Sequence, residues 1–352
     1  MPGNKDLNKA KDAKKDEFYT TRQDIEAELC HYAEHFKDKV VYCNCDDPVT
    51  SEFWQFFVRN FKPYGLKKLI ATHYEPDEKN YAYSLEICED TNGDGRIDYL
   101  DEPTVKQLPC NGDFRSAACI ELLKEADIVV TNPPFSLFRE YMAQLMEYGK
   151  KFVIIGSLNA VKYRDIFPYM KNNEIWLGQS IHSGDRMFYV PDDYPLNASN
   201  CGIDGETGRK FIRVKGVRWF TNLDVPYRHE KIDLRGNYYV RSRYPVYANF
   251  NAIDVSKTEE IPCDYNGVMG VPISFLDRYN PEQFEIIGLG TGYLGQSIGV
   301  TGIPKEHKSK MRGHSAAGDL YYLLPDGEPK VPYSRILIKN KNPEPRRYPD
   351  ED

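Results

Sequence analysis

The segment DIVVTNPPFS, residues 127–136, places a polar turn directly after an apolar run. The run 127–131 predicts a buried strand, and Ser136–Tyr148 carries apolar residues at helical spacing. The turn between the two consists of Asn132, Pro133, Pro134 and Phe135. A motif that stands between a strand and a helix in this order is typical of a functional turn, and the simpler alternative is a structural Pro-Pro turn.

The residue types of this turn suit one kind of chemistry. Two consecutive prolines fix the backbone and remove two amide donors, so their carbonyl oxygens and the Asn132 side chain are expected to face a cleft. An exocyclic amine can donate one hydrogen to the Asn132 amide oxygen and the other to the Pro133 carbonyl. Its nitrogen then keeps a lone pair for attack on an electrophile, and Phe135 offers a flat apolar face to a planar base.

Other apolar runs alternate with helical segments. Strands are predicted at 39–43, 68–72, 105–108, 127–131 and 151–156. One helix is expected to begin after Thr21, with Asp24 placed as in a capping box, and another over residues 50–61. This alternation favours an α/β fold with a parallel, doubly wound sheet. Because ligands bind beyond the carboxyl ends of such strands, the chemistry is expected in the loops 44–48, 112–114 and 132–135.

The composition limits the class of protein. The 352 residues are enough for about two domains. The formal net charge of −7 excludes a uniformly basic nucleic-acid coat but allows a local basic face. The polar N-terminal stretch lacks the apolar core of a secretory signal, no run is long enough to span a membrane, and the eight cysteines include no CxxC pair. We therefore expect a cytoplasmic protein with reduced thiols and no membrane partner.

Six segments together resemble one family, the EcoRI-type adenine-specific DNA methyltransferases. They are EFYTTRQDIEAEL (17–29), VVYCNCDDPVTSEFW (40–54), NGDFRS (111–116), DIVVTNPPFS (127–136), VRWFTNLD (217–224) and GVPISFLDRYNPEQFEIIG (270–288). The resemblance implies a Rossmann-like S-adenosylmethionine-dependent methyltransferase sheet with a β-rich C-terminal target-recognition region. It also implies methyl transfer to N6 of an adenine flipped out of double-stranded DNA, in a restriction-modification system whose cognate endonuclease would act separately.

The resemblance also assigns roles to single residues. The catalytic set, which would hold the target adenine, is Asn132, Pro133, Pro134 and Phe135. The cofactor-binding set is Tyr19, Thr20, Thr21, Asn44, Cys45, Asp46, Pro48, Asp113, Phe114 and Asn132. Its first three members would hold the methionine end of the cofactor, the next four would form the turn beneath it, and the Asp-Phe pair would contact its adenine ring. That turn, CNCDDP, departs from the family pattern because it has no glycine, and Glu75 is the nearest candidate for an acid that binds the ribose.

The expected domain organisation follows from this resemblance and from the composition. Residues 1–16 are rich in Lys and Asp and predict a disordered leader. The catalytic domain is expected at 17–224, with an acidic hairpin insertion at about 75–104. A target-recognition and DNA-binding region is expected at 225–341, and a flexible, proline-containing tail at 342–352.

A basic stretch is the candidate DNA surface. Residues 205–247 contain ten Lys or Arg against four Asp or Glu, a local charge of +6 (10 − 4), and tyrosines are interleaved with them. Such a mixture suits phosphate neutralisation and packing on bases or sugars, and the alternative is a solvated strand face. With a second basic loop at 307–314, the predicted DNA-binding residues are Lys210, Arg213, Lys215, Arg218, Arg241, Arg243, Lys308, Lys310 and Arg312.

An acidic loop matches the twelve-residue calcium loop, with oxygen-bearing side chains at five of its ligand positions and a glycine at the sharp turn. The five residues are Asp90, Asn92, Asp94, Asp98 and Asp101. The last position is Asp where Glu is usual, and the flanking segments predict strands rather than paired helices. A structural Ca²⁺ ion and an acidic hairpin tip are both left open.

Three further alternatives stay open on the sequence. GTGYLG (290–295) is either a displaced cofactor loop or, since no long amphipathic helix follows, a glycine-rich turn close to a ligand or to backbone. HYAEH (31–35) is either a zinc-binding helix or a solvated helix surface. The DNA adenine hypothesis competes with methylation of cytosine N4, RNA adenine or protein glutamine, and with a DNA-binding protein that has no catalytic activity.

Overall fold

The computed structural model describes residues 18–45, 47–75, 80–93, 101–196, 199–239, 244–309 and 317–345. These residues form two compact units. The N-terminal unit comprises residues 18–160 and 176–223, and the C-terminal unit comprises residues 161–175 and 224–345, less the gaps just given. No helix in the described ranges is long and apolar enough to cross a membrane.

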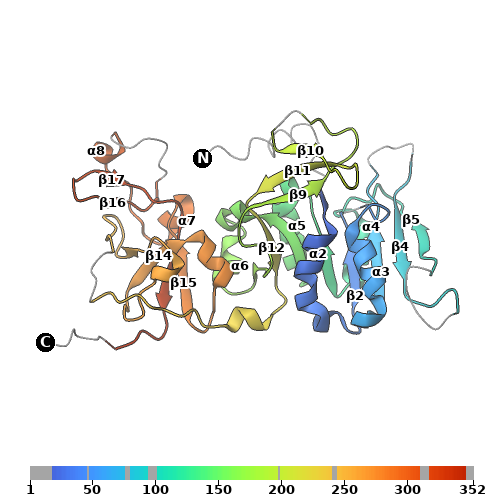
Figure 1. The fold of residues 1–352 in the computed structure, drawn as a ribbon, viewed down its shortest axis with the longest axis horizontal. Helices are drawn as coiled ribbons and strands as arrows, with labels where there is room; N and C mark the ends of the chain where they lie inside the picture. The colour runs from blue at the N-terminus through green and yellow to red at the C-terminus, as the bar shows by residue number, and fades with distance from the viewer. Residues whose placement is uncertain are drawn as a thin grey trace. The chain divides into compact units, whose positions relative to one another are not determined.

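The core of the N-terminal unit is a mixed sheet (Figure 1). Its order is β5 (Thr104–Gln107), β4 (Tyr83–Ile87), β3 (Lys68–Thr72), β2 (Val40–Cys43), β6 (Ile128–Thr131), β7 (Lys151–Ser157), β12 (Val217–Thr221) and β8 (Trp176–Leu177). The four central strands β3, β2, β6 and β7 are parallel, and every other pairing is antiparallel. The central strands are apolar and almost entirely buried because helices cover both faces of the sheet.

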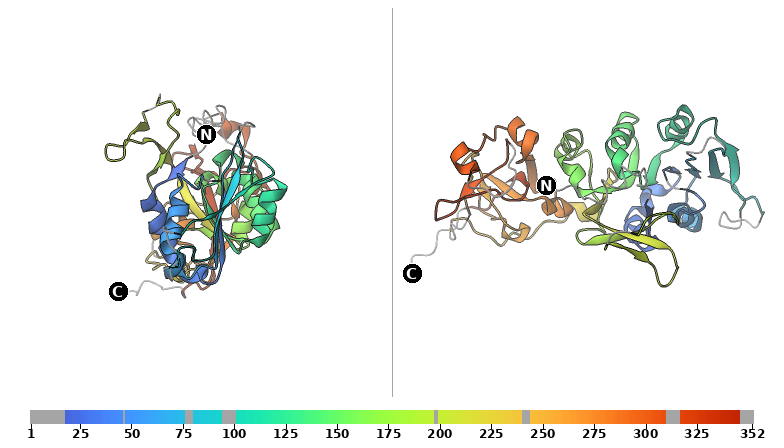
Figure 2. Two further views of the ribbon diagram at one scale, coloured as in Figure 1. Left: turned by 90° about the vertical axis from the view of Figure 1, so that its right-hand side faces the viewer. Right: turned by 90° about the horizontal axis from the view of Figure 1, so that it is seen from above.

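Helices lie on opposite faces of this sheet, as the left view of Figure 2 shows. One face carries α2 (Arg22–Leu29) and α3 (Glu52–Tyr64), and the other carries α4 (Ala117–Glu125) and α5 (Phe138–Glu147). The chain runs through α3 from β2 outward to β3, and through α5 from β6 outward to β7 in the opposite direction. Right-handed crossovers in opposite directions place their helices on opposite faces. The predicted α/β class is confirmed, as a large mixed sheet.

One predicted strand has a different place in the sheet. The sequence suggested a third parallel strand at 105–108, but β5 pairs antiparallel with β4, which in turn pairs antiparallel with β3. All four residues of β5 are exposed, which fits an edge strand without a second neighbour. Two reversals of direction bring β5 back to the direction of β3, so their carboxyl ends still lie at the same edge of the sheet.

A smaller antiparallel sheet is attached to the same unit. Its order is β1 (Tyr19–Thr20), β9 (Asp185–Tyr189), β11 (Lys210–Lys215) and β10 (Cys201–Ile203). The β10–β11 end extends away from the main sheet, as the yellow-green hairpin in the left view of Figure 2 shows. The β1 end lies beside the main sheet, since Thr20 is paired with Phe188 and α2 begins directly after it.

The C-terminal unit contains a four-stranded sheet and short helices. The sheet order is β13 (Ile253–Asp254), β14 (Val268–Pro272), β18 (Arg335–Asn340) and β15 (Phe284–Leu289), and β16 (Tyr322–Leu323) pairs with β17 (Pro329–Lys330). Its α-helices are α6 (Phe167–Lys171), α7 (Gly292–Ser297) and α8 (Lys305–Lys308). The 3-10 helices of both units are η1 (Cys30–Phe36), η2 (Phe135–Leu137), η3 (Leu158–Lys162), η4 (Pro226–His229), η5 (Thr258–Glu260) and η6 (Ile273–Arg278).

The GTGYLG segment, residues 290–295, packs closely against neighbouring residues, and its last four residues form the start of α7. A Cβ atom added at Gly295 would overlap the carbonyl oxygen of Gly318, and one at Gly290 would overlap the Leu320 side chain. Helix α7, which begins within the segment at Gly292, has only six residues. The predicted close approach to backbone is therefore confirmed at Gly295, and α7 is too short to be the long amphipathic helix that a displaced cofactor loop requires.

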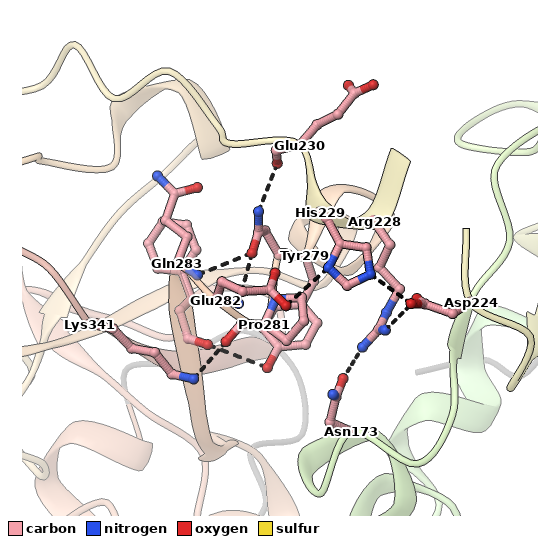
Figure 3. Close-up of polar contacts among 12 residues, drawn as sticks. Asn173, Asp224, Arg228, His229, Glu230, Tyr279, Pro281, Glu282, Gln283 and Lys341 are labelled. Carbon is pink, nitrogen blue, oxygen red and sulfur yellow. Dashed lines mark hydrogen bonds and ion pairs between the residues drawn. The ribbon is translucent and has the colours of Figure 1, made fainter. Parts of the chain in front are cut away.

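A polar cluster fixes the start of the C-terminal unit (Figure 3). Arg228, which is only 8% exposed, donates through Nη1 to Asp224 Oδ1 at 2.9 Å and through Nη2 to Asn173 Oδ1. His229 lies between two carboxylates, with Nε2 2.8 Å from Asp224 Oδ2 and Nδ1 3.0 Å from Glu282 Oε1. The cluster thereby joins residues 224–229 to the 161–175 segment and to the loop before β15.

We expect His229→Gln to lower stability mainly at acidic pH. Asp224 first, and then Glu282, raises the pKa of His229 above its ordinary 6.5. A pKa that is raised in the folded state gives stabilisation that is fully present below the unfolded-state pKa and is lost as the pH rises through the folded-state pKa. Because the side chain is partly exposed, the free energy of unfolding should fall by no more than about 1 kcal/mol at about pH 5.5, and by less at about pH 9.

Urea denaturation at the two pH values measures this difference, with His31→Gln as a control on an exposed histidine. An equal loss of stability at both pH values would contradict a titrating contribution from His229.

Candidate active site

A buried asparagine, Asn44, joins β2 and β6. Between these two strands the strand order reverses, because β3 is added on one side and β7 on the other. Asn44 follows β2 and is 2% exposed. Its carbonyl oxygen accepts a hydrogen bond from Thr131 Oγ1 at the end of β6, and its Oδ1 accepts one from the Tyr141 hydroxyl on α5. Burial raises the pKa of Tyr141 well above its ordinary value, which keeps this hydroxyl a donor. The loops after β2 and β6 are therefore held side by side.

Asn132 lies directly beyond this junction, at the carboxyl end of β6. Its side chain is 5% exposed, and its Nδ2 donates to the carbonyl oxygen of Phe18. Because the amide group is planar, this bond also fixes the direction of the Oδ1 atom. The Pro134 carbonyl accepts from the Leu137 amide at 2.9 Å, and this bond opens η2 and leads the chain into α5.

Three phenylalanine rings surround the start of this turn. Phe135 packs edge-on against Phe18 at a centroid distance of 5.9 Å and against Phe188 at 6.3 Å. The third pair, Phe18 and Phe188, is 6.0 Å apart. These contacts bring the N-terminal segment, the asparagine turn and the small sheet together, and they leave Phe135 half-buried.

The three residues predicted to hold the methionine end of a cofactor differ in their surroundings. Thr20 is 2% exposed, and its Oγ1 has no hydrogen-bond partner among the described residues. Thr21 caps helix α2 instead, because its Oγ1 accepts from the Asp24 amide at 3.3 Å. This confirms the predicted capping box and commits the Thr21 hydroxyl to the helix. Tyr19 is paired with Tyr189 in the small sheet.

The turn after β2 is formed without glycine. Cys45 has a left-handed φ of 68°, a conformation that glycine usually supplies. Asp47 Oδ1 accepts from the amides of Val49 and Thr50 at 2.8 and 3.1 Å, which shapes the approach to α3. Pro48 is buried, and Asp46 lies outside the described residues.

The loops after β3 and β5 meet at the same edge. The Glu75 amide donates to the Asn111 carbonyl at 2.8 Å, and a Cβ atom on Gly112, whose φ is 80°, would overlap the His73 carbonyl oxygen. Phe114 is 5% exposed and packs edge-on against Tyr141 at 5.0 Å. The loops after β3 and β5 are therefore linked to each other, and the loop after β5 also packs on α5, which carries Tyr141.

Asp113 is paired with its neighbour Arg115. The guanidinium donates through Nε to Asp113 Oδ1 at 2.9 Å and through Nη2 to Oδ2 at 2.6 Å. This bidentate bond lowers the pKa of Asp113 and keeps the carboxylate ionised.

His73 was missed by the sequence reasoning. Its Nδ1 lies 2.7 Å from Asp47 Oδ2, its Nε2 lies 3.6 Å from Glu75 Oε2, and its ring stacks on Tyr83 at 4.9 Å. The available signal was its position, since it is the first residue after β3. The imidazole links the turn after β2 to the acid that follows β3.

Comparison with known proteins identifies the family of this chain. Residues 6–341 match the family model described as "Adenine-specific methyltransferase EcoRI". The chain belongs to that family. It is 45% identical to the type II methyltransferase M.EcoRI of Escherichia coli over 344 residues, which cover 96% of this chain and 97% of that protein. No solved structure matches the chain.

Two mycoplasma proteins are also similar to this chain. M.MpnI of Mycoplasma pneumoniae is 41% identical over 80% of this chain and 84% of its own length. M.MgeORF184P of Mycoplasma genitalium is 39% identical over 80% of this chain and 85% of its own length. Both are named type II methyltransferases. The family confirms an adenine-specific methyltransferase over the cytosine, RNA, protein and non-catalytic alternatives, and a methyltransferase of this family uses S-adenosylmethionine.

The predicted DNA-binding residues fall into different environments. Lys215 is exposed, whereas Lys210 Nζ donates to the carbonyls of Asp192 and Tyr194. Arg213 lies over the Phe211 ring at 5.6 Å, with Nη1 3.7 Å from Asp185 Oδ1.

Arg218 departs from the expectation of a surface charge. It is 4% exposed in β12, and its guanidinium donates to the carbonyls of Val217 and His182. It therefore supports the backbone, because β12 lies between β7 and β8 and all five of its residues are buried. Lys308 is exposed on α8, and four of the predicted residues lie outside the described ranges, namely Arg241, Arg243, Lys310 and Arg312.

The acidic loop is partly described. Asp101 Oδ1 accepts from the Thr91 amide at 2.7 Å and from the Asn92 amide at 3.3 Å, and Asp90 Oδ1 accepts from the Gly93 amide at 2.6 Å. Asp94 and Asp98 lie outside the described residues, so the calcium loop stays a prediction. Within the ranges that the structure covers, no three His, Cys, Asp or Glu side chains are grouped to hold a metal ion, and this includes the HYAEH segment.

We expect Tyr141→Phe to destabilise the N-terminal unit. The substitution leaves the buried Asn44 Oδ1 without the Tyr141 donor, which should lower the free energy of unfolding by about 1–3 kcal/mol. Chemical denaturation measures the change, with Tyr81→Phe, at a side chain that is 61% exposed, as the matched control. Equal stabilities of the two variants would show that this bond does not hold the junction.

Proposed function

We propose that this chain is a site-specific DNA methyltransferase that transfers a methyl group to N6 of an adenine flipped out of the duplex. The supporting observation is the position of Asn132, which lies at the carboxyl end of β6 with its amide plane fixed by the Phe18 carbonyl. The reversal of the sheet between β2 and β6 supports a Rossmann-like fold, in which a ligand binds at this point.

The residues around the reversal fit S-adenosylmethionine. The buried Thr20 hydroxyl, which lacks a partner among the described residues, is a polar group available to a ligand at the N-terminal side of the site. The chain would hold the cofactor through Thr20 and Tyr19, the turn of Asn44, Cys45, Asp46 and Pro48, and the Asp113–Phe114 pair. Thr21 would contribute only its backbone because its hydroxyl caps α2. The cofactor supplies an electrophilic methyl group on a sulfonium.

Asn132 and Pro133 would orient the nucleophile. The Asn132 Oδ1 accepts one hydrogen of the adenine amine and the Pro133 carbonyl accepts the other, so the nitrogen lone pair is directed away from both. Phe135 presents its ring to the base, held in place by Phe18 and Phe188. No ionisable base is needed for the attack, because the amine loses its proton during or after transfer. The main contribution of these residues is alignment.

The DNA is proposed to contact basic residues of both units. Lys215 and Arg213 lie on β11, in the small sheet that extends from the N-terminal unit (Figure 2), and Lys308 lies on α8 of the C-terminal unit. The positive charges of these three side chains favour contacts with the DNA phosphates. We assign target recognition to residues 225–341 and catalysis to residues 17–224. The methylated product would protect DNA from a cognate endonuclease that acts separately.

We expect Asn132→Ala to reduce methyl transfer by at least about 100-fold, because it removes one of the two acceptors that orient the amine. Binding of S-adenosylmethionine should change little, since the cofactor contacts are made mainly by other residues. Transfer of a labelled methyl group to duplex DNA and calorimetric cofactor titration measure the two effects. Asn172→Ala, at an exposed position, is the control. Near wild-type transfer by Asn132→Ala would remove the site assignment.

The identity of the product tests the reaction itself. Plasmid DNA from cells that express the chain should yield N6-methyl-2′-deoxyadenosine on enzymatic digestion and mass analysis, and DNA from cells that express Asn132→Ala should not. Methylated cytosine in place of methylated adenine would contradict the proposed substrate.

A further inference from the structure

Two exposed tyrosines of the C-terminal unit each carry a cation. Tyr293, on α7, is 54% exposed, and the Arg164 guanidinium lies 4.3 Å from its ring centroid. Tyr333, just before β18, is 55% exposed, and Lys162 Nζ lies 4.5 Å from its centroid and 3.0 Å from its hydroxyl. The two pairs give this part of the unit exposed aromatic rings with a positive charge beside each.

The two cations are close together in the chain and have no acidic partner among the residues that the structure describes. Lys162 and Arg164 are two residues apart, so their Cα atoms are within about 7 Å. Their contacts within the described residues are to the two tyrosines, and no ion pair of either cation with a carboxylate is found there. Two adjacent charges without internal compensation attract an anion.

The surface is held rigidly. Asp319 Oδ1 accepts from Thr291 Oγ1 at 2.6 Å and from the Gly292 amide at 3.0 Å, which fixes the start of α7, the helix that carries Tyr293. The close approach of Gly295 to Gly318 holds the same helix at a second point. This gives the GTGYLG segment a role, because its glycines allow the tight packing from which Tyr293 projects.

The chemistry of the surface suits the backbone of duplex DNA. A guanidinium that stacks on a tyrosine keeps its planar N–H edge free of the ring, and that edge can donate two parallel bonds to a phosphate. An ammonium bonded to one hydroxyl keeps two further donors. The exposed ring surfaces can pack on the sugars that lie between the phosphates.

We propose that Lys162, Arg164, Tyr293 and Tyr333 form a surface of the C-terminal unit that binds the phosphates and sugars of double-stranded DNA. This inference rests on the proposed function, and it adds residues outside the basic stretches that the sequence singled out. Because the contacts are made to the backbone, the surface contributes affinity without reading bases.

A salt titration of DNA binding by the full-length chain tests the proposal. The double variant Lys162→Gln/Arg164→Gln should make the slope of log K against log salt shallower by about 1.8, two phosphate contacts at about 0.9 each. The decrease in slope should be the same for a duplex that contains a sequence methylated in the plasmid and for a duplex of unrelated sequence. The matched control is Lys257→Gln/Lys339→Gln, which removes the same charge from two exposed lysines of the same unit, and it should keep the wild-type slope.

A charge-conserving variant, Lys162→Arg/Arg164→Lys, should also keep the wild-type slope, and an unchanged thermal transition verifies that each variant is folded. A wild-type slope in the Gln double variant would overturn the proposal, as would an equal loss in the control variant. Cofactor binding by calorimetry and DNA methylation are also measured for the wild-type chain. A wild-type chain that does not methylate DNA would refute the proposed function, whereas an unchanged salt slope in the Gln double variant would refute only the contact surface.

Discussion

The buried amide of Asn44 is the contact on which the candidate site depends. Thr131 donates to its carbonyl and Tyr141 to its side chain, so three elements, β2, β6 and α5, meet at one residue. The order of the strands reverses at this point, and open α/β sheets bind ligands beyond the carboxyl ends of the strands at such a reversal. Asn132 follows Thr131 immediately, so the same contacts that hold the two strands together also fix the origin of the asparagine turn.

At the candidate site the acidic side chains have polar partners, and the site also contains the side-chain amide of Asn132. Asp113 is neutralised by Arg115, and Asp47 lies against His73. Asn132, directly beyond the junction at Asn44, is uncharged, and its Nδ2 donates to the Phe18 carbonyl oxygen. This arrangement suits an amine nucleophile, which needs acceptors for its hydrogens rather than an ionised base.

Hydrogen-bonded carboxylates also hold segments together in the C-terminal unit, where they support exposed side chains. Gly295 and Gly318 allow two backbone segments to pack closely, and Asp319 accepts hydrogen bonds at the start of α7. The His229 cluster ties the entry segment to the loop before β15 (Figure 3). Both devices produce a rigid support in a unit whose helices are short, so exposed side chains such as Tyr293 have a defined position.

The sequence by itself determined the apolar strands, the capped start of α2 and the asparagine turn between β6 and α5, because hydrophobic spacing and turn residues act over a few neighbouring positions. Only the tertiary structure decided the reversal of β5 through β4, the burial of Arg218 and the contact of His73 with Asp47. Each of these depends on which distant segment becomes a neighbour. A residue's own type and spacing do not encode that choice, since pairing between remote strands is set by the packing of the whole sheet.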